Sequence, residues 1–100
     1  MDEMSTTSEL ARLAARYCWD MTPSQAADYP DRVILRTMDL GTLQDIIALE
    51  QCFGRSRLAE VLARATAGAL KPRSWAFWHY RLGLVPPGHA LPPQPTRRVA

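Results

Sequence analysis

The chain has 100 residues, of which 47% are hydrophobic and 22% are charged, and its formal net charge is +2 at pH 7. This length allows one domain at most, and the hydrophobic content is too high for a disordered chain. No hydrophobic run approaches the roughly 20 residues that a spanning helix needs, and no basic segment precedes a hydrophobic one at the start. We therefore expect a small cytoplasmic protein.

The first third of the chain predicts two helices. Thr6 and Glu9 form a capping-box pattern that opens a helix through about Tyr17, with hydrophobic residues at helical spacing. Residues 22–25 read Thr-Pro-Ser-Gln, a second cap with proline at the first helical position. That second helix has two turns at most, because Pro30 interrupts it.

The segment 30–40 fits two structures. It reads as a helix that starts at Pro30 and ends before Gly41, or as a short buried strand at residues 33–35. We favour the helix, because nothing else in the chain offers a strand partner and a lone strand cannot pair its backbone.

Two further helices are predicted on either side of Gly54. Thr42 and Asp45 form the clearest cap in the chain, and the helix that follows should stop at Gly54. The second helix spans about residues 56–65. The first should bury four hydrophobic residues: Leu43, Ile46, Ile47 and Phe53.

Residues 70–84 hold four of the eight aromatic residues of the chain. Pro72 favours a helix start and Gly83 a helix end. One helix face would carry Trp75, Trp78, His79 and Leu82, of which we expect Trp78 and Leu82 to anchor the core. The other side is the candidate for partner contact, because interface centres concentrate aromatic and arginine side chains. It carries Arg73, Phe77, Arg81 and Leu84.

Five of the final 16 residues are prolines, which predicts an extended, flexible tail over residues 85–100. A polyproline-ligand pattern at residues 92–97 is short enough to arise by chance, so we expect a disordered, solvated tail. The predicted fold is all-α: a compact bundle of four or five short helices over residues 7–84, with residues 1–6 frayed.

Charge is distributed unevenly along the chain. Residues 1–54 contain nine acids and four bases, whereas residues 55–100 contain eight bases and one acid, Glu60. This asymmetry suggests an anionic partner for the second half, although scattered arginines also solubilise helix surfaces.

The two helices around Gly54 resemble a helix-turn-helix, and an alternative function is therefore DNA binding by a transcriptional regulator of its own operon. Its phosphate-contacting residues would be Arg55, Arg57 and Arg64. Three positions depart from that pattern: Glu50, Arg55 and Glu60.

No residues form a recognisable catalytic or metal site, so we predict no enzymatic activity, no cofactor and no metal. His79 should be a neutral core histidine, and His89 falls in the tail. Cys18 and Cys52 lack the close spacing of structural zinc ligands, and we expect both as free thiols.

Short motifs between residues 17 and 84 resemble one known family. They are Tyr-Cys-Trp-Asp at 17–20, Leu-Gly-x-Leu-x-Asp-Ile at 40–46, Phe-Gly at 53–54 and a Leu-x-Pro … Phe-Trp … Leu-Gly-Leu ending at 70–84. They resemble small bacterial proteins encoded just upstream of AbiEii-type nucleotidyltransferase toxins and treated as antitoxins. Lys71 stands where that family often has a Ser cap.

The resemblance implies that the protein binds and neutralises a nucleotidyltransferase toxin through a folded helical surface. Such toxins build their sites around metal-chelating carboxylates, which a basic aromatic helix could cover. The family has no established catalytic residues, so the resemblance implies none for this chain.

Overall fold

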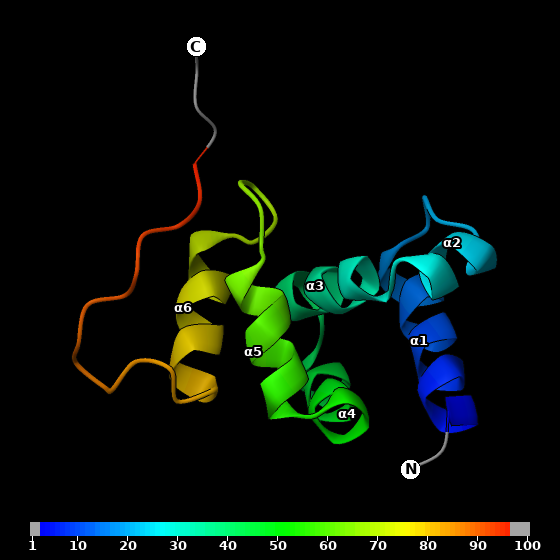
Figure 1. Cartoon of the computed structure of the whole chain (residues 1–100), viewed down its shortest axis with the longest axis horizontal. Coiled ribbons are helices and arrows are strands. Elements are labelled where there is room, and N and C mark those ends of the chain that lie inside the picture. Colours follow the sequence, from blue (N-terminus) through cyan, green and yellow to red (C-terminus); the bar gives the residue numbers. More distant parts are fainter. Residues whose placement is uncertain (1–2, 97–100) are drawn as a thin grey trace.

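A computed structural model of the protein describes residues 3–96, which form six α-helices and no strand (Figure 1). The helices are α1 (Glu3–Tyr17), α2 (Pro23–Asp28), α3 (Pro30–Leu40), α4 (Leu43–Phe53), α5 (Arg55–Ala63) and α6 (Pro72–Arg81). The predicted all-α class is confirmed, and the strand considered for residues 33–35 is helical. There are six helices in this part of the chain rather than four or five, counting the short α2 as a helix of its own.

The start of the first helix differs from the prediction. α1 begins at Glu3, so Thr6 lies inside the helix and does not cap it, and residues 3–6 are helical rather than frayed. Residues 1–2 lie outside the described part of the chain. The cap of α2 is as predicted: the Thr22 hydroxyl accepts from the Gln25 amide at 3.1 Å, and the Gln25 side chain accepts from the Thr22 amide at 2.9 Å.

α3 lies at the centre of the fold, with α1 and α2 at one end and α5 and α6 at the other (Figure 1). It contacts each of the other helices, and Val33, Ile34 and Met38 are buried. Thr37 is also fully buried, and its hydroxyl donates to the Val33 carbonyl at 2.8 Å, which satisfies the polar group. None of the helices within residues 3–96 is both long enough and hydrophobic enough to cross a membrane.

Two glycines set the corners on either side of α4. At Gly41 an added Cβ would lie 2.5 Å from the Thr37 carbonyl oxygen, so a larger residue would distort the end of α3. Gly54 has φ +83°, which side chains other than glycine rarely adopt. This conformation lets α5 begin with only Gly54 between it and the end of α4.

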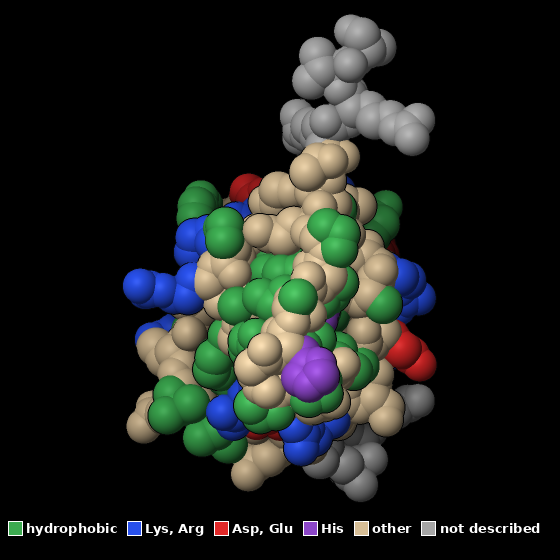
Figure 2. Space-filling view, turned by 90° about the vertical axis from the view of Figure 1, so that its left-hand side faces the viewer, with side chains coloured by type: hydrophobic (Ala, Val, Ile, Leu, Met, Phe, Trp, Pro, Cys, Tyr) green, Lys and Arg blue, Asp and Glu red, His purple; other side chains and the backbone are tan. Residues whose placement is uncertain are grey.

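The Pro-rich segment packs along α6 within residues 85–96. The Trp75 indole donates to the Pro92 carbonyl at 2.8 Å, and the Tyr80 hydroxyl donates to the His89 carbonyl at 3.0 Å. Leu91 packs against the core. Hydrophobic side chains cover the middle of this face of the molecule, with Lys and Arg along its edges (Figure 2).

This segment is non-helical and mostly exposed to solvent, as predicted, but these contacts attach it to α6, which the sequence prediction did not include. The cause lies in α6, whose aromatic groups carry N–H and O–H donors that need acceptors once they are covered. The segment's carbonyls supply those acceptors. Gln94 adds a third link by donating to the Leu70 carbonyl at 3.1 Å. Residues 97–100, the rest of the predicted tail, lie outside the described residues.

Candidate functional site

The inward side of α6 is built around Trp78. Its side chain is fully buried, and its indole donates to the Met38 carbonyl of α3 at 2.8 Å. His79 is buried beside it, with Nδ1 donating to the Trp75 carbonyl at 2.7 Å. Leu82 is half-buried against the same core. The structure therefore shows the predicted core side of this helix, and His79 is a hydrogen-bonded core histidine.

The outward side of α6 carries the predicted partner-contact residues. Phe77 is 38% exposed, and its ring meets the Trp78 ring edge-on with 5.3 Å between centroids. Leu84 is 48% exposed, and Arg73 is also exposed. The Arg81 guanidinium lies 5.6 Å from the centre of the Phe77 ring. Phe77, Leu84 and Arg73 thus present hydrophobic or charged surface to solvent, whereas Arg81 is partly buried against its neighbours.

That fourth residue, Arg81, is clamped to α4. Its Nε and Nη2 donate to the two carboxylate oxygens of Glu50 at 2.8 and 2.7 Å. The hydrogen bond holds the pKa of Glu50 below its ordinary value and raises the pKa of Arg81. Arg81 therefore joins two helices that both pack on α3, and its charge is not free for a partner.

α4 exposes hydrophobic residues that the sequence prediction placed in the core. Leu43 is 61% exposed and Ile47 is 40% exposed, whereas Ile46 and Leu49 are buried. The helix has apolar residues around much of its circumference, and only one side can face α3. Since Leu43 and Ile47 are four residues apart, they lie on one face, and the prediction that both are buried is wrong.

A hollow lies between the start of α4 and the outward side of α6. Its walls include Gly41 and Ile46 on one side and Arg73 and Phe77 on the other. A second hollow around the Glu50–Arg81 clamp includes Ile47. We call the surface formed by Leu43, Ile47, Arg73, Phe77 and Arg81 the α4–α6 face.

The arginines of the alternative DNA-binding site do not form one surface. Arg57 and Arg64 share the Asp31 carboxylate, at 2.6 and 2.9 Å. Arg55 instead donates to the Arg81 carbonyl. The turn is also shorter than a helix-turn-helix turn, which has about three or four residues, because only Gly54 separates the two helices.

These pairs also explain much of the charge asymmetry. Four of the bases in the second half pair with carboxylates of the first half: Arg57 and Arg64 with Asp31, Lys71 with Asp39, and Arg81 with Glu50. Within residues 3–96, Arg55 and Arg73 have no such carboxylate partner. Most of these basic residues therefore form ion pairs within the domain, and fewer remain available to a partner.

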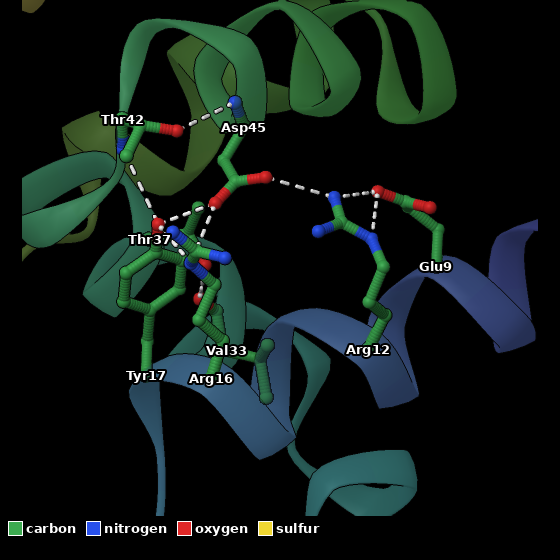
Figure 3. Close-up of polar contacts among 8 residues, drawn as sticks. All are labelled: Glu9, Arg12, Arg16, Tyr17, Val33, Thr37, Thr42 and Asp45. Atoms are coloured by element: carbon green, nitrogen blue, oxygen red, sulfur yellow. Dashed lines mark hydrogen bonds and ion pairs between the residues drawn. The ribbon is translucent and has the colours of Figure 1, made fainter.

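A buried polar cluster joins α1 to the start of α4 (Figure 3). Asp45 is 5% exposed and accepts a hydrogen bond from the Tyr17 hydroxyl. Arg12 donates to it at 3.0 Å, and Arg16 lies 3.2 Å from its second oxygen. The Tyr17 oxygen also accepts from the Thr42 amide at 3.2 Å.

Sequence reasoning identified Asp45 only as the partner of the Thr42 cap, an interaction that the structure shows at 3.3 Å. The hydrogen bond from Tyr17, supported by Arg12 and Arg16, lowers the pKa of Asp45 despite its burial. Every oxygen of this carboxylate is occupied by a donor from the protein, so the cluster stabilises the fold and offers no open position for a ligand.

Comparison with known proteins finds no matching family model, curated protein or solved structure. Within residues 3–96, no group of three or more His, Cys, Asp or Glu side chains could hold a metal ion. Membership of the antitoxin family that the motifs resemble therefore stays a prediction.

Proposed function

We propose that the protein is an antitoxin-type interaction protein that binds its partner through the α4–α6 face. One observation carries this proposal: exposed hydrophobic side chains lie at two hollows between α4 and α6 while the core beneath them is filled. Phe77 lines one hollow and Ile47 lines the other, and Leu43 is exposed one turn from Ile47 on α4. Exposed hydrophobic groups gathered in one patch are typical of protein interaction sites, and arginine beside aromatic residues is typical of their centres.

The partner we propose is a nucleotidyltransferase toxin, as the sequence resemblance implies. Arg73 and Arg55 border the two hollows without a carboxylate partner in the described chain. A surface with this charge complements an acidic one, and carboxylates surround the metal site of a nucleotidyltransferase. The α4–α6 face would then cover that acidic cleft and block its substrates.

The geometry gives less support to the DNA-binding alternative. Arg57 and Arg64 would have to leave Asp31 to contact phosphates, and their shared carboxylate would repel a DNA backbone. The alternative predicts promoter binding that weakens steeply with salt and depends on these two arginines. Absence of a promoter shift at micromolar protein in low salt would remove it.

Co-expression with the product of the neighbouring open reading frame, which the proposal predicts to be a nucleotidyltransferase toxin, tests the proposal. The wild-type chain should form a monodisperse complex with the toxin and relieve its growth arrest. Ile47→Asp and Phe77→Asp should abolish both effects while leaving the fold intact, because both side chains are already exposed. Ala15→Asp, at an exposed position of α1, is the matched control and should behave as wild type. Rescue by all three variants would contradict the proposed face.

A further inference from the structure

A second groove lies between α3 and residues 64–69, which follow α5. Two hollows, of about 310 and 400 Å³, share three lining residues and so form one continuous groove; the shared residues are Arg32, Leu35 and Thr66. Their volumes fall at the lower end of small-ligand sites, about 300–1,000 Å³. We call it the α3 groove, and the proposed function does not use it.

Positive charge exceeds negative charge around the α3 groove. Four guanidinium groups line or border it and two carboxylates face them: Arg32, Arg36, Arg57 and Arg64, with Asp20 and Asp31. Arg36 is only loosely paired, at 3.9 Å from an exposed Asp20. Arg32 has no carboxylate within ion-pair distance in the described chain. The groove therefore retains a surplus of positive charge for an anionic ligand.

Exposed aromatic rings accompany these arginines. Trp19 is 75% exposed, with the Arg36 guanidinium 5.9 Å from its ring. Tyr29 is 54% exposed, with the Arg32 guanidinium 5.4 Å from its ring. Because Arg32 and Arg36 are four residues apart on α3, both pairs lie on one side of that helix. Cation–π contact orients each guanidinium, and most of the Trp19 side chain stays open to solvent.

We propose that the α3 groove binds single-stranded nucleic acid. Phosphates would lie against Arg32 and Arg36, and an unpaired base would stack on Trp19. Stacking on an aromatic ring combined with a positively charged groove is the general mode by which proteins bind single strands.

A duplex and a protein partner both fit the α3 groove less well. Paired bases would leave Trp19 without a base to stack on. α3 is packed at the centre of the fold, so it cannot enter a major groove. A protein interface would need exposed aliphatic surface, whereas Leu35, which lines both hollows, is half-buried and the rims are mainly arginine.

Fluorescence anisotropy with a fluorescein-labelled 12-mer oligouridylate tests this proposal on the isolated chain. Binding should occur at micromolar protein in low salt and weaken as salt rises. Trp19→Ala should weaken it about tenfold or more, as loss of a stacking platform does. Arg36→Ala should also weaken it and reduce the salt slope by about 0.7. Arg73→Ala removes the same charge from the α4–α6 face and should change little.

Tryptophan emission gives an independent readout, because Trp75 and Trp78 are buried and binding should quench Trp19. Trp19→Phe should lose the quenching but keep part of the affinity, since a ring remains. An oligothymidylate 12-mer shows whether ribose is required. Thermal melts should show that Trp19→Ala folds normally.

Four outcomes would overturn the proposal. The first is no binding of either oligonucleotide, and the second is equal loss from Arg73→Ala and Arg36→Ala, which would indicate non-specific attraction. The third is a duplex that displaces the labelled oligonucleotide as effectively as an unlabelled single strand does. The fourth is a protein complex that Trp19→Ala disrupts when no oligonucleotide binds, which would make the groove a protein interface.

Discussion

Phe77 and Trp78 are consecutive residues of α6 with touching rings, yet one is exposed and the other is buried. Trp78 is fully buried and hydrogen-bonded to α3, whereas Phe77 is 38% exposed beside a hollow. The Pro-rich segment is attached to the same helix through Trp75 and Tyr80, each of which donates to one of its carbonyls. One short helix therefore serves the core, holds the C-terminal segment and leaves one side to a partner.

The largest effect should come from Trp78. Trp78→Ala removes a fully buried aromatic and leaves a cavity, so it should lower the free energy of unfolding by about 3–5 kcal/mol. Urea denaturation measures this value. A loss below about 1 kcal/mol would show that the core does not depend on this side of α6.

The carboxylates Asp45 and Asp31 should differ in the same way, because the first is buried and the second is partly exposed. Asp45→Asn should cost about 2–3 kcal/mol, because it weakens charge-assisted hydrogen bonds in a buried cluster. Asp31→Asn should cost no more than about 1 kcal/mol, since Asp31 and its two arginines are partly exposed, with side-chain exposures of 42%, 40% and 64%. Equal losses in urea denaturation would contradict the view that only the first carboxylate is essential to the fold.

Acid titration sharpens that prediction. The pKa values of Asp45 and Glu50 are lowered in the folded state, so each contributes stability above its unfolded pKa, about 4. This contribution is lost as the pH falls through the lower folded pKa. Wild type should therefore lose stability below about pH 4, and Asp45→Asn should lose less over the same range. Parallel stability curves for the two proteins would refute this assignment.

The Pro-rich segment should have an intermediate effect. Ending the chain at Val85 removes the acceptors of Trp75 and Tyr80, and the packing of Leu91. It should cost about 1–2 kcal/mol, the sum expected for two hydrogen bonds. A truncated chain with an unchanged melting temperature would show that the segment does not stabilise α6.

The smallest effect on stability should come from the outward side of α6. Phe77→Ala combined with Arg73→Ala should cost less than about 1 kcal/mol, because both side chains are already exposed. Partner binding should be lost instead. Arg81→Ala is less suitable here, since it would leave Glu50 unpaired and disturb the clamp. Strong destabilisation of the double variant in urea would show that this side also belongs to the core.

Local sequence signals predicted most helix boundaries. Caps and turn residues act on their immediate neighbours, so a short stretch of sequence is enough to indicate a helix end. The structure has the predicted helix ends at Thr42, Gly54 and Pro72. The burial of Trp78 also followed from spacing. The first cap failed because the helical pattern continues upstream of Thr6, so a capping sequence there had no helix end to cap.

The candidate site was only half predictable. Spacing identified Phe77 and Arg73, but it could not tell which apolar side of α4 would face α3, so Leu43 and Ile47 were missed. The ties of Asp45 to Arg12 and Tyr17 span 33 and 28 residues, and no local pattern indicates such pairs. Similarly, proline content predicted an extended segment but not that α6 would supply donors for it.

Hydrogen–deuterium exchange of the chain, alone and bound to the nucleotidyltransferase, tests the central claim most directly. The α4–α6 face predicts new protection in peptides covering residues 43–50 and 73–81, with little change in α1 and α2. Protection confined to α1 and α2, with α4 and α6 unchanged, would contradict it.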